Sequence, residues 1–208
     1  MMKTHGMSEA EIAEKHARKM ALKKAARDKM LATKTREKGL LMVHTGKGKG
    51  KSTAAMGLAV RAIGHGMRVG IVQFVKGVWS TGERKILDDY PALCVIRAMG
   101  EGFTWDTQDR ARDIRAAENA WDMACSMLDD PSFSLVILDE LNIVLRYEYL
   151  DLEKVVARLQ ARREGLHVVV TGRNAREALL EAADMVTEMT QIKHHFRADI
   201  KAQQGIEF

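Results

Sequence analysis

The fold of this 208-residue chain is decided by Leu40-Leu41-Met42-Val43-His44-Thr45 and the following Gly46-Lys47-Gly48-Lys49-Gly50-Lys51-Ser52. The first six residues are an apolar run typical of a buried strand, and residues 51–65 have apolar side chains at helical spacing. A glycine-rich turn between a strand and a helix is the context that a phosphate loop requires. We therefore expect this stretch to bind the phosphates of a nucleotide.

Each residue type in the loop suits that chemistry. Glycines let the backbone curl so that N–H groups point at phosphate oxygens, and the helix that follows directs its positive end at the same place. Lys51 supplies a cation for the outer phosphates, and Ser52 offers a hydroxyl to Mg²⁺. Lys47 and Lys49 belong to the predicted ATP-binding loop, without a catalytic role. Thr45 stands where the common motif G-x-x-x-x-G-K-[ST] has its first glycine, so we expect a tighter loop.

Two later strands end in charged residues. The apolar run 135–138 is followed by Asp139 and Glu140, which would hold Mg²⁺ directly or through water beside a phosphate loop. The alternative is a helix cap with an acidic first turn, and spacing does not decide which carboxylate contacts the metal. Arg173 follows the run 167–171 and would lie near the triphosphate, unless it is an ordinary surface arginine.

Apolar runs alternate with helical stretches from Leu40 onwards, which predicts an α/β fold of the P-loop NTPase class. Its sheet is expected to be mainly parallel, with helices on both faces. We expect one catalytic domain over residues 40–208 that binds nucleotide. Its predicted strands are 40–45, 68–75, 94–99, 134–138, 167–171 and 185–189, and its predicted helices are 51–65, 107–128, 152–163 and 176–183.

Residues 1–39 differ from the rest in charge. They hold 11 Lys or Arg against 5 Asp or Glu, so the net charge of +5 belongs to this segment and predicts no nucleic-acid surface. Residues 8–37 are predicted to form a helix that Ser8 and Glu11 start as a capping box. The segment is either a solvated, partly disordered tail or an arm that packs on the core or on a second subunit.

The composition favours a cytoplasmic protein. Two cysteines cannot build a disulfide framework and suit a reducing compartment. No apolar run is long enough to span a membrane, and the N-terminus lacks the apolar stretch of a signal peptide. We therefore expect neither a membrane nor a nucleic-acid partner.

The motifs alone do not name a reaction, because ATPase motors, small-molecule kinases and GTPases share them. A GTPase is disfavoured by the lack of an Asn-Lys-x-Asp guanine-reading motif. A P-loop ATPase, or an ATP-dependent binding or regulatory protein whose basic arm docks a partner, stays as the alternative to a transferase.

The sequence resembles the P-loop type ATP:cob(I)alamin (corrinoid) adenosyltransferases over about residues 40–208. Besides the loop, the matching runs are Arg61-Ala62-Ile63-Gly64-His65-Gly66, Val72-Gln73-Phe74-Val75-Lys76-Gly77, Gly82-Glu83-Arg84, Gly100-Glu101-Gly102-Phe103-Thr104-Trp105, Leu138-Asp139-Glu140-Leu141, Thr171-Gly172-Arg173, His194-His195-Phe196 and Gly205-Ile206-Glu207. The glycine at position 46 in place of 45 is also a trait of this family.

The resemblance implies a cytosolic homodimer with a RecA-like sheet. Such an enzyme moves the 5′-deoxyadenosyl group of ATP to the Co(I) of a reduced corrinoid and releases inorganic triphosphate. Mg²⁺ or Mn²⁺ assists, and an electron donor such as a reduced flavoprotein supplies Co(I). The nucleophile belongs to the corrinoid, so the protein needs no nucleophilic side chain.

The resemblance also assigns residues beyond the loop. Phe103 and Trp105, which by composition alone suit core packing, are implied to press on the lower face of the corrin and displace its axial base, which eases reduction of Co(II). Arg61 is implied to approach the sugar or phosphates of ATP. Gln73 and Lys76 are implied to line the same edge of the sheet.

Overall fold

The computed structural model describes residues 8–75, 81–99 and 109–207. The chain divides into two compact units, the first ending at Glu37 and the second beginning at Lys38.

The described part of the first unit, residues 8–37, contains helix α1 (Glu9–Ala32), in which no residue is buried. The predicted capping box is confirmed, because the Ser8 side chain accepts from the Glu11 N–H and the Glu11 carboxylate accepts from the Ser8 N–H. The predicted end at residue 37 is wrong. Thr33 caps the helix instead, and its hydroxyl donates to the Met30 carbonyl at 2.7 Å. With no buried apolar face, only local bonds set the length of this helix.

In the second unit, the described residues form one six-stranded sheet with the order β3-β2-β4-β5-β1-β6. Every recorded strand pair is parallel. The strands are β1 (Leu41–Thr45), β2 (Val69–Gln73), β3 (Cys94–Ala98), β4 (Leu135–Asp139), β5 (His167–Thr171) and β6 (Met185–Glu188). Each lies within a few residues of its predicted range, and the predicted P-loop α/β class is confirmed.

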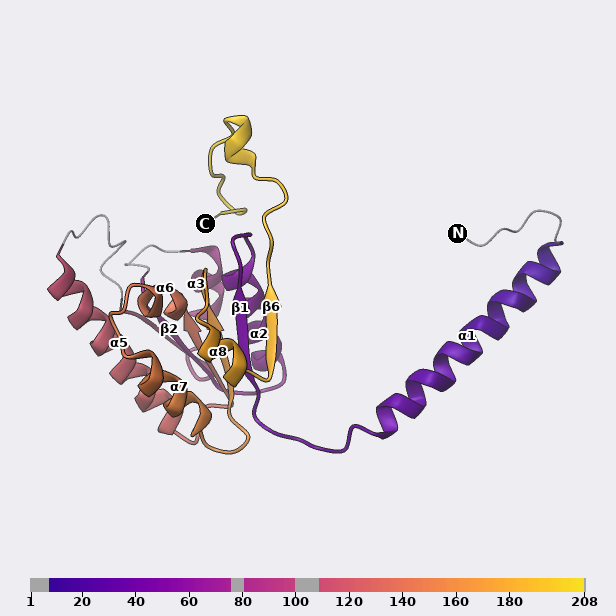
Figure 1. Ribbon diagram of the computed structural model, residues 1–208, viewed down its shortest axis with the longest axis horizontal. Coiled ribbons are helices and arrows are strands. Elements are labelled where there is room, and N and C mark those ends of the chain that lie inside the picture. Colours follow the sequence, from indigo (N-terminus) through magenta and orange to yellow (C-terminus); the bar gives the residue numbers. More distant parts are fainter. Residues whose placement is uncertain (1–7, 76–80, 100–108, 208) are drawn as a thin grey trace. The chain divides into compact units, whose positions relative to one another are not determined.

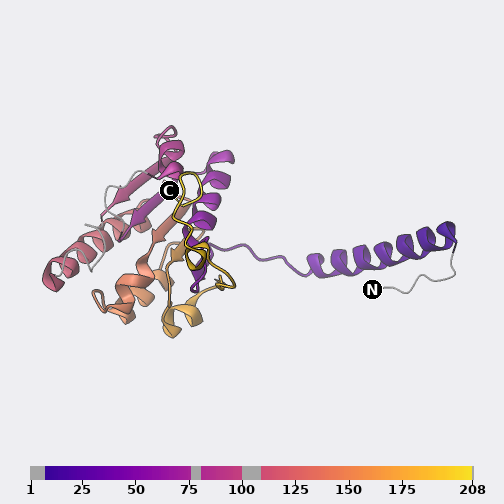
Figure 2. The same ribbon diagram turned by 90° about the horizontal axis from the view of Figure 1, so that it is seen from above.

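Helices cover both faces of the sheet, as Figures 1 and 2 show. On one face lie α5 (Arg110–Asp129), α6 (Leu141–Arg146), α7 (Leu152–Gln160) and α8 (Glu177–Ala182), and on the other lie α2 (Lys51–Gly64) and α3 (Gly82–Leu87). Alternate strand residues serve the two layers, since Leu41 and Val43 pack on the first face and Met42 on the second. Both faces of the central strands are therefore apolar, as buried parallel strands require, whereas all four residues of the edge strand β6 are exposed.

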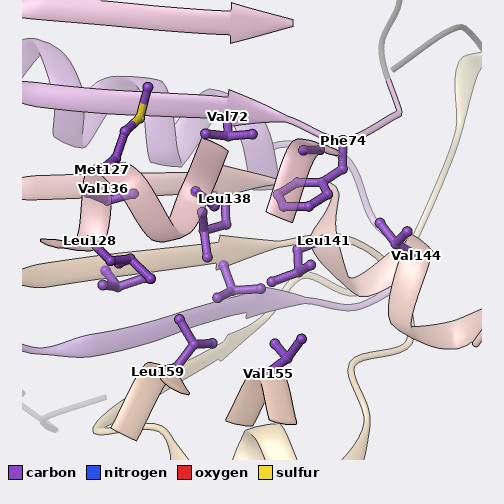
Figure 3. Packing of buried hydrophobic residues seen from close by; sticks show 14 of the residues in the cluster. Val72, Phe74, Met127, Leu128, Val136, Leu138, Leu141, Val144, Val155 and Leu159 are labelled. Atoms are coloured by element: carbon purple, nitrogen blue, oxygen red, sulfur yellow. The ribbon is translucent and has the colours of Figure 1, made fainter. Parts of the chain in front are cut away.

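Figure 3 shows the core on the α5 face. Val72, Val136 and Leu138 of β2 and β4 meet Met127 and Leu128 of α5, while Val155 and Leu159 of α7 close the same cluster. Burying each such side chain stabilises the fold by about 1.5–3 kcal/mol. This packing fixes the strand ends on which the candidate site is built.

Three predicted elements were too long, and two helices, α3 and α6, were missing from the predicted set, although the sequence allowed a helix after Glu140 as the alternative to a metal site. β2 ends at Gln73 rather than residue 75, α7 at Gln160 rather than 163, and α5 begins at Arg110 within the described residues. Helix α3 was not predicted, because its six residues offer too little periodicity to detect. Its start is marked by Thr81, whose side chain accepts from the Arg84 N–H.

No helix among the described residues is long and apolar enough to cross a membrane.

Candidate functional site

The glycine-rich loop joins the end of β1 to the start of α2, as predicted. Gly46 and Gly50 have φ values of 96° and 103°, a region that favours glycine. The Lys51 ammonium group folds back over the loop and donates to the carbonyl oxygens of Gly46, at 2.9 Å, and Gly48. The loop therefore holds its lysine in place above the curled backbone.

Two of the loop glycines have a second role that sequence reasoning missed. The Gly48 N–H donates to the carbonyl of Met189 at 2.6 Å, just after β6. A Cβ atom on Gly46 would lie 2.4 Å from that oxygen, and one on Gly48 would lie 2.7 Å from it. These positions need glycine partly so that the chain leaving β6 can pass against the loop.

Thr45 explains the missing first glycine of the common motif. It is the last residue of β1, it is buried, and its hydroxyl accepts from the Ala175 N–H at 3.1 Å. Position 45 therefore belongs to the strand and ties it to the segment between β5 and α8. The loop proper begins one residue later, at Gly46.

The two carboxylates at the end of β4 have different surroundings. Asp139 is fully buried and accepts from the Thr171 hydroxyl at 2.7 Å and from the Gln73 side-chain amide at 3.3 Å. Glu140 has a φ of 66°, its N–H donates to the Thr171 hydroxyl, and it lines a cavity. A non-glycine residue in this conformation is uncommon and recurs at functional sites. The sequence did not distinguish these two carboxylates, but the structure does, because Asp139 is buried and Glu140 lines the cavity.

The cavity has a volume of about 910 Å³, within the range of small-molecule sites. It lies beyond the carboxyl ends of the strands, where open parallel sheets bind ligands. Its wall combines loop residues 48–53, the start of α3, Glu140 with part of α6, Gly172 with Arg173, and the C-terminal Phe196 and residues 205–207.

The electrostatics of the cavity favour an anion. Burial lowers the pKa of Lys51, and the nearby positive charges of Arg173 and Lys49 lower it further, while Glu140 opposes them. A phosphate placed among these cations would relieve their mutual repulsion. The arrangement can bind a polyphosphate and stabilise negative charge that develops on it.

The structure brings together most of the predicted site. Gly48, Lys49, Gly50, Lys51, Ser52, Glu140 and Arg173 all line the cavity. Gln73 and Asp139 are buried and hydrogen-bonded to each other, and Lys47 is exposed within the loop. Arg61 is exposed in the last turn of α2, at the opposite end of that helix from the loop. Lys76, Phe103 and Trp105 lie outside the described residues.

Several wall residues had no predicted role. Arg146 of α6 and Glu83 of α3 line the cavity, as do Phe196, Ile206 and Glu207 near the C-terminus. No spacing rule points to the C-terminal residues, because tertiary contacts alone bring them to the loop. In the sequence, only the resemblance of the C-terminal segment to a known family pointed to Phe196, Ile206 and Glu207.

Comparison with known proteins covers nearly the whole chain. Residues 37–208 match the profile of the family described as "ATP:corrinoid adenosyltransferase BtuR/CobO/CobP". A "Corrinoid adenosyltransferase" of Sinorhizobium sp. is 56% identical over 93% of this chain and 92% of the relative. Another, from Pseudomonas aeruginosa, is 53% identical over 94% and 96%. Among solved structures, a RadB recombinase aligns with a TM-score of 0.45 and 15% identity, over 76% of this chain and 77% of that one.

Proposed function

This chain belongs to the ATP:corrinoid adenosyltransferase family, and from that premise we propose that it transfers the 5′-deoxyadenosyl group of ATP to the Co(I) of a reduced corrinoid. The cobalt electron pair attacks the ribose 5′ carbon. A Co–C bond forms, the C5′–O bond breaks, and inorganic triphosphate leaves with the electrons of that bond. The chain is a transferase, and both ATP and the corrinoid are its substrates.

The observation that carries this proposal is the phosphate loop in the wall of a cavity that Lys51 and Arg173 also line. The leaving group is the intact triphosphate, so the protein's task is to stabilise its charge as it departs. Lys51 and Arg173 face the cavity where the loop ends, and the loop amides continue into the positive end of α2. No side-chain nucleophile is needed, because cobalt supplies the attacking electrons.

The donor set in the same wall fits Mg²⁺ or Mn²⁺. Ser52 and Glu140 both line the cavity, and Asp139, which precedes Glu140, is fully buried. Hard oxygen donors of this kind suit Mg²⁺, which keeps water and phosphate oxygens as its other ligands. Bound there with ATP, the ion would add positive charge next to the departing triphosphate. We propose Ser52 and Glu140 as its protein ligands or water partners, with Asp139 holding the strand end in place.

The remaining assignments follow from the family. We propose that Phe103 and Trp105 press on the lower face of the corrin, and that Gln73 and Lys76 support the nucleotide edge of the sheet. Arg61 lies in the last turn of α2, far from the phosphate loop at the start of that helix. Its role in ATP binding is therefore proposed on the family resemblance alone. We also propose that the protein is a homodimer in the cytoplasm. A reduced electron donor, such as a flavoprotein, would supply the Co(I) state of the corrinoid.

The test incubates the purified protein with ATP, Mg²⁺ and chemically reduced cob(I)alamin. The expected result is the absorbance spectrum of a light-sensitive Co–C bond, with triphosphate formed in equal amount. Release of ADP that does not depend on the corrinoid would support a P-loop ATPase or regulatory protein instead and would overturn the proposal.

A further inference from the structure

The segment after β6, residues 189–207, touches the phosphate loop at both of its ends. At its start, Met189 accepts the Gly48 N–H at 2.6 Å. At its end, the Glu207 carboxylate accepts a hydrogen bond from the Lys49 ammonium and forms an ion pair with it. His195 lies 3.4 Å from the other carboxylate oxygen of Glu207. Figure 1 shows this segment, in yellow, beyond the end of β6.

The two attachments differ in kind. At the start, backbone packs on backbone, and even one added methyl group at Gly46 or Gly48 would not fit. At the end, two flexible side chains meet, and the Lys49 side chain is 50% exposed. The first contact is part of the fold, whereas the second can exchange for another anion without moving the backbone of the loop.

The Glu207 carboxylate carries a full negative charge in this position. Its hydrogen bond and ion pair with Lys49 lower its pKa, against the opposing effect of burial. Its side chain is only 10% exposed, although it sits on a cavity wall that also contains Lys49 and Lys51. A carboxylate placed there stands near the position that the phosphate oxygens of a nucleotide would occupy.

We propose that Glu207 competes with the polyphosphate of the substrate for Lys49, so that the chain carries its own tethered inhibitor of the phosphate loop. A triphosphate brings several negative charges to a wall where Glu207 already neutralises this lysine. One ammonium group cannot neutralise both anions, and the two anions repel each other across the cavity. The inference rests on the polyphosphate-binding part of the proposed function and needs no corrinoid.

Polyphosphate binding then releases the C-terminal end of the segment, while Met189 holds its start. Phe196 and Ile206 line the same cavity, so release of Glu207 alters the apolar part of the cavity wall. Polyphosphate binding at the loop is thereby coupled to the shape of the cavity wall that Phe196 and Ile206 form.

The test measures binding of inorganic triphosphate, with Mg²⁺, to the full-length protein by titration calorimetry at low ionic strength. Glu207→Gln should bind triphosphate about two- to five-fold more tightly, because an ion pair whose lysine is half-exposed opposes the ligand only modestly. In a Lys49→Met background the same substitution should change the affinity much less. Glu83→Gln, which removes a carboxylate from the same cavity, is the matched control and should give a smaller gain that does not depend on Lys49.

An unchanged or weaker affinity of Glu207→Gln overturns the proposal, as does an equal gain with Lys49 replaced. Trypsin gives a second readout, because Lys193, Arg197 and Lys201 are its cleavage sites within the segment. Triphosphate should speed cleavage there in the wild-type protein, and Glu207→Gln should be cleaved faster without it. Protection by triphosphate would contradict the competition. A protein that fails to adenosylate corrinoid but shows these effects would refute the proposed function and leave this inference standing.

Discussion

At the scale of single residues, several constraints act on Lys51 at once. Its ammonium is held by two loop carbonyls, is partly removed from water and lies near a second and a third cation. Such preorganised charge costs little reorganisation when a leaving group becomes more negative. Lys51→Ala should lower kcat/KM for adenosyl transfer on the order of 10²-fold or more. An active Lys51→Ala protein with an unchanged circular dichroism spectrum would contradict the role of the loop.

The pH dependence of the reaction should report on the same lysine. Because burial and Arg173 lower the pKa of Lys51, kcat/KM should fall on the alkaline side at a lower pH than the usual value of 10.5 for lysine. Lysine carries its charge below its pKa, so a lower pKa means an earlier loss of activity as the pH rises. Arg173→Gln removes one cause of the lowering and should move this alkaline limb to higher pH, besides reducing the rate.

Arg176→Gln is the matched control for that shift, since Arg176 pairs with Glu148 outside the cavity. Its pH profile should coincide with that of the wild type. An identical shift in both variants would mean that the limb reflects the net charge of the protein rather than Lys51.

Phe103 and Trp105 give a prediction that depends on the oxidation state of cobalt. If they displace the axial base to ease reduction, Phe103→Ala should impair the reaction from Co(II) with a weak reductant by at least about ten-fold, equivalent to about 1.4 kcal/mol. The reaction with Co(I) prepared beforehand should change much less. Equal losses from both starting states, measured by the rate of Co–C bond formation, would indicate a general structural defect instead.

Some residue positions were predictable from the sequence and others were not. The loop residues 48–52 and Arg173 line the cavity as expected, because a motif and a strand end place them. The difference between Asp139 and Glu140 depends on Thr171 and Gln73, which come from neighbouring strands, so no local pattern contains it. The contact between Glu207 and Lys49 is likewise tertiary, since the two residues are 158 positions apart in the chain.

At the scale of elements, the central strands β1, β2, β4 and β5 were predicted well because burial on both faces leaves an uninterrupted apolar run. Helix ends were predicted less well, because they depend on capping bonds such as that of Thr33. On α2 the predicted apolar face is confirmed at Ala55, Ala59 and Ile63. The same helix contains Gly57, where an added Cβ would meet nothing within 4 Å.

Gly57 and Gly48 should therefore respond in opposite ways to the same substitution. Gly57→Ala should stabilise the protein by about 0.5–1 kcal/mol, because alanine is the better helix former and nothing obstructs it. Gly48→Ala should destabilise it and weaken triphosphate binding, because the new methyl group would lie 2.7 Å from the Met189 and Thr190 carbonyl oxygens. Chemical denaturation and calorimetry measure both effects. If Gly48→Ala changed neither the stability nor the triphosphate affinity, the chain after β6 would be able to move away from the loop at little cost.

At the scale of the whole molecule, the two units differ in what holds them together. The second unit has a continuous core on both faces of its sheet, whereas α1 of the first has no buried residue. The junction belongs to the second unit, because Lys38 pairs with Asp184 and the Gly39 carbonyl accepts from the nearly buried Arg162 guanidinium. The charge difference between the two segments predicted a boundary near this point, but not the bonds that define it.

Removal of the arm tests that division. A protein beginning at Lys38 should keep the unfolding temperature of the full chain to within about 2 °C and should bind ATP equally well, because the helix that it removes has no buried residue. A protein beginning at Leu40 also loses the Lys38 ion pair and the Gly39 carbonyl, which leaves the Arg162 guanidinium without one acceptor. It should be less stable by about 1–2 kcal/mol. A large loss of stability or of ATP binding already at Lys38 would show that the arm packs on the catalytic unit or on its partner.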